Sequence, residues 1–153
     1  MKNLFDPTLV EDVKHRIICL RPDSERRWGK LPLPLVLAHC TSGFQMATGA
    51  IHPKRAPFPA NIMGPLIKPL VFRDDKPIRR NSPSSPELFT ADPTQCEFER
   101  ERAQLIQAID NFVATGPAGC TKHPHPFFGP LQPQQWAILM YKHVDHHLRQ
   151  FGA

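Results

Sequence analysis

The eighteen prolines of this 153-residue chain are the feature that most limits how it can fold. Proline lacks a backbone N–H and clashes with the preceding helical turn, so it starts, ends or interrupts helices. Apolar residues accompany the prolines throughout the chain. This distribution predicts helices with sharp ends that are joined by long, ordered loops.

Two helices are predicted in the first third of the chain. Over about 6–20, apolar residues recur at helical spacing behind Asp6, a good N-cap, and Pro7, which suits the first helical position. A second apolar stripe covers about 34–48 and is closed by Gly49.

Two further helices are predicted in the second half. The third starts at Asp92 and Pro93, where Gln95 completes a capping-box pattern with Asp92. The last runs over about 133–151 and has four-residue spacing of large side chains.

Residues 52–92 form the unusual part of the sequence. Eight prolines exclude one long helix there, although the apolar residues from Ile62 to Val71 can pack as a short, broken helix. We therefore predict one domain over 1–153, an all-α, antiparallel four-helix bundle. A long Pro-rich crossover lies between its second and third helices, and no series of strands is expected.

The charge pattern bears on possible partners. The net charge is +5, from 19 basic and 14 acidic residues, but the basic residues are scattered. Nucleic-acid binding is therefore kept only as a minor alternative. The segment around Ile62 to Val71 is expected either to cover a pocket or to form a homodimer surface.

The cysteines and the apolar runs bear on location. Four separate cysteines, with no signal peptide at the N-terminus, favour reduced thiols and a cytoplasmic protein. No apolar run reaches the length of a membrane span, so no membrane partner is expected.

Three histidines form the one constellation that can carry chemistry. His143 and His147 are four residues apart on the last predicted helix, so they share one face. His39 lies in the apolar second helix, where a buried imidazole needs a polar partner. Together they can hold one divalent metal ion with open positions. The alternative is that they are histidines with ordinary hydrogen bonds.

Three other histidines are weaker candidates for metal ligands. His146 points about a quarter-turn away from its neighbour His147 and is expected at the helix surface or as a support for a ligand. His123 and His125, in KHPHPFFGPL, are expected in a rigid loop that forms a pocket wall.

The strings RRWGKL, LAHC, FRDDKPIRRNSP, GPAGCTKHPHPFFGPL and YKHVDHHLRQFG together resemble a bacterial family of unknown function within the DinB/YfiT-like superfamily of metalloenzymes. The resemblance covers nearly the whole chain and implies a four-helix bundle. It also implies a divalent metal held by one histidine of the second helix and an HxxxH pair of the last. By motif position these are His39, His143 and His147.

The expected function follows from the residues and the resemblance together. The ion is expected to be zinc, nickel or iron, since imidazole suits each of them. We expect a metal-dependent hydrolase or a thiol transferase of the glutathione or bacillithiol type, with a small molecule or a thiol as its partner. The alternative is a non-catalytic bundle protein that binds a metal or a small ligand.

Overall fold

The computed structural model describes residues 1–80, 82, 86–89 and 91–153. Within these residues the chain is all-helical, with five α-helices and two short 3-10 helices, and no strand is formed. The elements in chain order are α1 (Pro7–Cys19), α2 (Leu33–Thr48), α3 (Ala60–Val71), the 3-10 helix η1 (Pro86–Leu88), α4 (Phe98–Thr115), the 3-10 helix η2 (Gly116–Gly119) and α5 (Pro133–Gln150). The predicted all-α class is confirmed.

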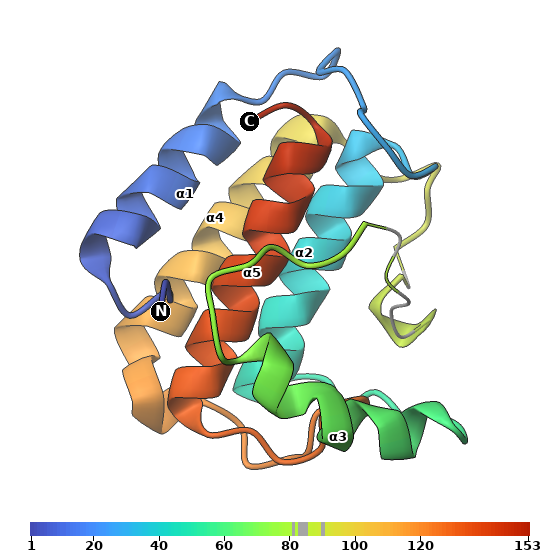
Figure 1. The fold of residues 1–153 in the computed structure, drawn as a ribbon. Coiled ribbons are helices and arrows are strands. Elements are labelled where there is room, and N and C mark those ends of the chain that lie inside the picture. Colours follow the sequence, from blue (N-terminus) through green and yellow to red (C-terminus); the bar gives the residue numbers. More distant parts are fainter. Residues whose placement is uncertain (81, 83–85, 90) are drawn as a thin grey trace.

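The four longest helices, α1, α2, α4 and α5, lie side by side, and α3 lies across one end of them (Figure 1). Each long helix turns an apolar stripe toward its neighbours, which removes that stripe from water. The largest fully buried side chains come from all four helices and include Ile17, Phe44, Phe112 and Trp136.

Two of the predicted helix ends are confirmed in detail. The Asp6 carboxylate accepts a hydrogen bond from the Thr8 N–H at 3.0 Å, and Pro7 occupies the first position of α1. Gly49 closes α2 in the left-handed conformation, with φ of 81°. That conformation strains residues with a side chain, so a glycine is favoured there.

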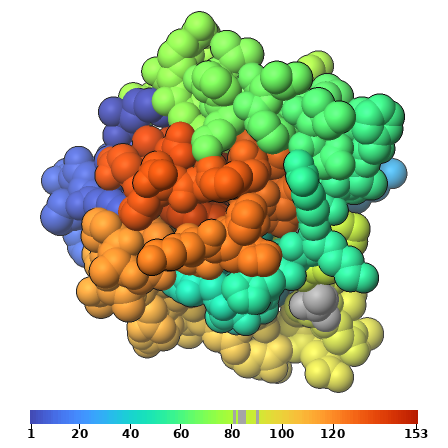
Figure 2. Space-filling view, turned by 90° about the horizontal axis from the view of Figure 1, so that it is seen from below, coloured from blue at the N-terminus to red at the C-terminus, as the bar shows by residue number. Residues whose placement is uncertain are grey.

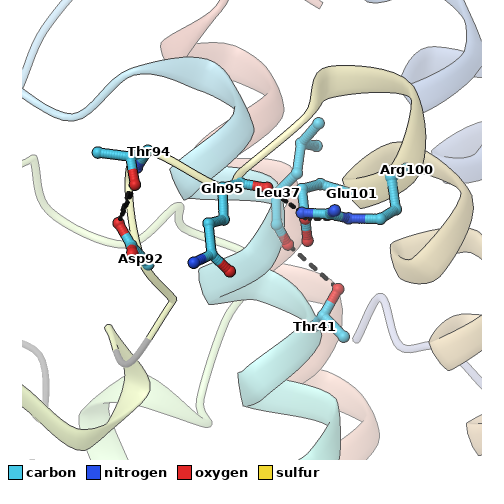
Figure 3. A network of polar contacts seen from close by, with 7 residues as sticks. All are labelled: Leu37, Thr41, Asp92, Thr94, Gln95, Arg100 and Glu101. Carbon is cyan, nitrogen blue, oxygen red and sulfur yellow. Dashed lines mark hydrogen bonds and ion pairs between the residues drawn. The ribbon is translucent and has the colours of Figure 1, made fainter.

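The predicted start of the third main helix is wrong. Asp92 does not cap a helix; its carboxylate accepts from both the backbone N–H and the hydroxyl of Thr94, and α4 begins only at Phe98 (Figure 3). Short polar side chains compete with helix formation by bonding to nearby backbone groups. Arg100 in the first turn of α4 then reaches back to the Gln95 carbonyl and pairs with the buried Glu101 (Figure 3).

The expected short, broken helix in the Pro-rich region is one continuous helix, α3, despite Pro65 and Pro69 inside it. Pro65 cannot donate to the carbonyl of Asn61, but that carbonyl accepts from Arg55 Nη2 at 3.3 Å. Another side chain therefore supplies a bond that the proline removes. Of the eight prolines in the region, Pro83 lies outside the described residues.

The chain leaving α3 runs back across α5 toward α2 (Figure 1). The buried Lys142 of α5 holds this crossover through its Nζ, which donates to the carbonyls of Val71 and Asp74, each at 2.7 Å. His146 Nδ1 donates to the Ile78 carbonyl at 3.2 Å. The connection therefore lies over the helices and is held there through its backbone carbonyls.

Two remaining sequence predictions can be compared with the fold. All four cysteines are free, and burial raises the pKa of the fully buried Cys40 thiol, which makes it a poor nucleophile. None of the described helices combines the length and the apolar character needed to cross a membrane.

Candidate metal centre

His39, His143 and His147 come together between α2 and α5. One ring nitrogen of each lies within 4.8 Å of the corresponding nitrogen of the other two. His39 is buried, whereas His143 and His147 are partly accessible. The ring centroids of His39 lie 4.7 Å from His143 and 5.1 Å from His147. The i, i+4 spacing on α5 and the facing position on α2 therefore produce the predicted cluster.

The orientation of His39 is set by the crossover. Its Nδ1 lies 3.3 Å from the carbonyl of Leu88 in η1, and a carbonyl can only accept, so Nδ1 carries the proton. The Phe89 ring stacks on the imidazole with a centroid distance of 4.1 Å and an interplanar angle of 4°. The proton-free Nε2 of His39 is therefore directed to the cluster.

His147 is oriented in the same way by Gln150. The Gln150 amide nitrogen donates to the Trp28 carbonyl at 2.9 Å, which directs the amide oxygen to His147 Nδ1 at 2.8 Å. Nδ1 thus carries the proton, and Nε2 keeps its lone pair. Gly29 makes room for this arrangement, because a Cβ there would lie 2.6 Å from the Gln150 amide nitrogen.

His143 completes the cluster from the middle of α5. Its Nε2 lies 2.9 Å from His39 Nε2, and since His39 carries its proton on Nδ1, His143 is the donor. Gly43 on α2 lets the helices approach here, because a Cβ at that position would lie 3.0 Å from His143 Nδ1. Gly43, four residues after His39 on α2, therefore makes room for the second histidine.

The electrostatics keep the cluster neutral. Burial lowers the pKa of His39 to about 4 and that of His147 to about 3. Burial also lowers the pKa of His143 well below its ordinary value, and the neighbouring histidines lower it further. Three neutral imidazoles are the form that binds metal ions at neutral pH.

The residues beside the HxxxH pair have supporting positions. His146 is buried, so the expected surface location is wrong; its ring lies 5.0 Å from that of His147 and 5.5 Å from that of Trp28. Asp145 pairs with Arg16 at 2.9 Å and with Arg149 at 2.8 Å, which ties α5 to α1.

His123 and His125 lie outside the cluster, as expected. His125 Nδ1 accepts from the N–H groups of Phe127 and Phe128, at 3.1 and 3.2 Å, and so stabilises the turn of its own loop. His123 packs on His52 with a ring-centroid distance of 4.4 Å. Both line a cavity of about 350 Å³ at the α3 end of the molecule, in keeping with the predicted pocket wall.

Sequence reasoning missed two groups that orient the ligands. Gln150 had a signal, since it lies three residues after His147 on the same helix face. No sequence pattern relates Leu88 and Phe89 to His39, because they lie 49 and 50 residues after it in a Pro-rich connection. Only the path of the crossover brings them to α2.

Comparison with known proteins adds a family. A family model described as "Protein of unknown function (DUF1569)" matches residues 5–153 of the chain. No curated protein and no solved structure matches the chain.

Proposed function

The chain belongs to the DUF1569 family, and because the function of that family is unknown, we propose one from the site itself: a protein that holds a divalent metal ion through His39, His143 and His147. The observation that carries the proposal is the orientation of the rings. The protonated Nδ1 atoms of His39 and His147 are bonded to Leu88 and Gln150, so both Nε2 atoms keep their lone pairs, and that of His39 lies 2.9 Å from His143 Nε2. Metal-binding histidines are commonly oriented by such bonds.

The three ligands would leave the ion with its full charge and with positions for a further ligand, because each imidazole is neutral and binds through one nitrogen. When bound, zinc, nickel or iron supplies Lewis acidity for hydrolysis or for activation of a thiol. We therefore propose a metal-dependent hydrolase or a thiol transferase, with a small molecule or a thiol as substrate.

The residues of the chain have defined parts in this proposal. His143 would bind through Nε2 once its proton moves from that atom, where it donates to His39, to Nδ1, the nitrogen next to Gly43. Phe89 stacks on His39 and keeps water from that side of the ring. His123 and His125, in the loop before α5, are not among the proposed ligands.

We also propose a more specific fold than the all-α class. An antiparallel four-helix bundle of the DinB/YfiT-like kind places one ligand on its second helix and two on its last. The described order of helices supports this, since α2 supplies His39 and α5 supplies the pair, while α3 is inserted in the long connection.

A second candidate is a non-catalytic metal-binding protein. The burial of His39 and its stacking against Phe89 favour this alternative, because a structural ion is enclosed by its surroundings. A catalytic ion instead keeps a position that substrate can reach, which the partial accessibility of His143 and His147 favours.

Elemental analysis of the untagged protein tests the site. We expect near-stoichiometric metal in the wild type and its loss in both His39→Ala and His143→Ala, with folding checked by circular dichroism. His123→Ala is the matched control, since it removes a histidine outside the cluster, and should keep the metal. Unchanged metal in the two cluster variants, or none in a wild type offered zinc, nickel and iron, would refute the proposal.

Activity assays then separate the two candidates. Metal-loaded protein is compared with the His143→Ala variant in thiol-transfer and ester-hydrolysis screens. Turnover that needs both the ion and His143 supports an enzyme, whereas a folded, loaded protein without turnover that loses thermal stability on chelation supports a structural ion.

A further inference from the structure

A cavity of about 350 Å³ lies at the α3 end of the molecule, apart from the three-histidine cluster. This volume is within the range of small-molecule sites. Its walls come from the segment before α3, from α3 itself and from the loop before α5. Five of the lining residues are prolines: Pro53, Pro65, Pro124, Pro126 and Pro130.

The walls of the cavity are held by backbone contacts. The N–H of Ala56 donates to the Pro126 carbonyl at 3.0 Å, which joins the segment before α3 to the loop. His125 and Gly129 exchange two backbone hydrogen bonds, at 2.9 and 3.0 Å. Gly64 of α3 lies so close to the loop that a Cβ would be 1.8 Å from the Phe127 carbonyl oxygen. The cavity is therefore formed before any ligand binds.

His125 provides one hydrogen-bond donor to the cavity. Nδ1 of His125 accepts from two backbone N–H groups, so it has no proton, and Nε2 carries the N–H. That N–H makes no hydrogen bond within the part of the chain that the structure describes. The burial of the ring lowers its pKa to about 4. His125 therefore lines the cavity as a neutral donor.

Arg55 adds a positive charge at the same place. Its guanidinium donates one hydrogen bond to the Asn61 carbonyl, which leaves its other N–H groups available, and it pairs with no carboxylate among the described residues. No carboxylate lines the cavity within that part of the chain. The planar N–H groups of arginine match the two oxygens of a carboxylate.

We propose that this cavity binds a small organic carboxylate, with the carboxylate group on Arg55 and His125 and the apolar body against the proline rings. Proline rings offer rigid apolar surface, and fixed donors lose little conformational entropy on binding. None of the three histidines of the proposed metal centre lines the cavity, so the carboxylate is expected to bind whether or not a metal ion is present.

Benzoate is a suitable probe, followed by amide shifts of ¹⁵N-labelled protein. We expect saturable shifts at Ala56, His125 and Phe127, and at least tenfold weaker binding in Arg55→Ala. Lys54→Ala is the matched control, because it removes an exposed neighbouring charge that does not line the cavity; its affinity should change less than twofold. Arg55→Lys should fall between wild type and Arg55→Ala.

Three further results decide the proposal. Benzamide, which has the shape of benzoate without the charge, should bind at least tenfold more weakly, and inorganic phosphate should not displace benzoate. The affinity of the His39→Ala variant, which removes a proposed metal ligand on α2 that does not line the cavity, should equal that of wild type, which separates this site from the metal centre. Equal effects of Arg55→Ala and Lys54→Ala, equal binding of benzamide and benzoate, or an absence of saturable shifts would overturn the proposal.

Discussion

The proposed metal centre and the proline-walled cavity both contain histidines that burial keeps neutral, but their ring nitrogens carry the proton at opposite positions. At the centre, Nδ1–H groups of His39 and His147 donate to oxygens, so lone pairs on Nε2 face the site. At the cavity, His125 Nδ1 accepts from backbone N–H groups, so Nε2–H is the group that remains. The first arrangement suits a cation and the second an anion. The partner of Nδ1, not the residue type, decides which ligand a buried histidine can take.

Lowering the pH should produce the largest loss of stability, because it acts on buried histidines of both the proposed centre and the cavity. The pKa of His39 and of His125 is about 4 in the folded chain, below the ordinary 6.5. Their stabilising contribution is thus complete above pH 6.5 and is lost as the pH falls toward 4, because the unfolded chain binds the protons first. Metal-free protein should lose roughly 3 kcal/mol of unfolding free energy per histidine over this interval.

Urea unfolding between pH 8 and 4 measures this loss. His125→Phe should show a shallower pH dependence while keeping its metal content, which assigns part of the effect to the cavity. A stability that stays constant from pH 7 to 5 would contradict the lowered pKa values.

Gly64→Ala should damage the cavity and spare the centre. The new Cβ would meet backbone atoms of Phe127, at 1.8 Å from its oxygen, and backbone cannot rotate away. We expect α3 to separate from the loop, with a loss of about 2–3 kcal/mol of unfolding free energy and unchanged metal content. Gly43→Ala is the control, since its Cβ would meet the His143 side chain at 3.0 Å. It should weaken metal binding with little change in stability, and the same response from both variants would argue against two separate sites.

Gln150→Ala should weaken the centre and spare the cavity. Without the amide oxygen, nothing fixes the proton of His147 on Nδ1, and the metal dissociation constant should rise by about 10- to 100-fold. Calorimetric titration with zinc measures the change. Gln107→Ala, which removes a glutamine of α4 whose amide nitrogen donates to Asn111, should behave as wild type. An unaltered zinc affinity in Gln150→Ala would show that Gln150 does not orient the ligand.

Leu66→Ser should have the smallest effect on stability. Leu66 is 72% exposed on α3, and several other apolar side chains of this helix are exposed with it. Several exposed apolar side chains on one helix are typical of an interaction surface. The sequence-based proposal for this surface is a homodimer. Light scattering should give a dimer for wild type and a monomer for Leu66→Ser, with unfolding free energies measured on the monomers within about 0.5 kcal/mol of each other. A monomeric wild type would contradict the proposal that α3 forms a homodimer surface.

The comparison also shows where sequence patterns are sufficient. Helical periodicity located α1, α2 and α5 to within a residue or two, because apolar spacing and the end signals at Asp6, Pro7 and Gly49 are local properties. The pattern at Asp92 was misleading, since Thr94 offers that carboxylate a nearer partner than the start of a helix. Local signals compete, and the sequence alone does not rank them.

Seen from below, α3 and its flanking residues lie next to the loop and the start of α5, a neighbourhood of segments far apart in the chain (Figure 2). The cavity arises only from this packing, which no spacing of prolines could reveal. The apolar character of α3 was evident in the sequence, which left open whether the segment covers a pocket or forms a surface, because burial depends on which elements meet.

The sequence by itself pointed to three histidines that could hold a metal ion. His143 and His147 share a face because helical geometry places residues four apart together, and His39 lies in an apolar helix that requires a partner for its ring. Tertiary structure decided how the rings are oriented: the crossover brings Leu88 to His39, and the end of α5 brings Gln150 to His147. These bonds join residues that sequence spacing cannot relate, since they form only when the helices pack and the connection closes over them.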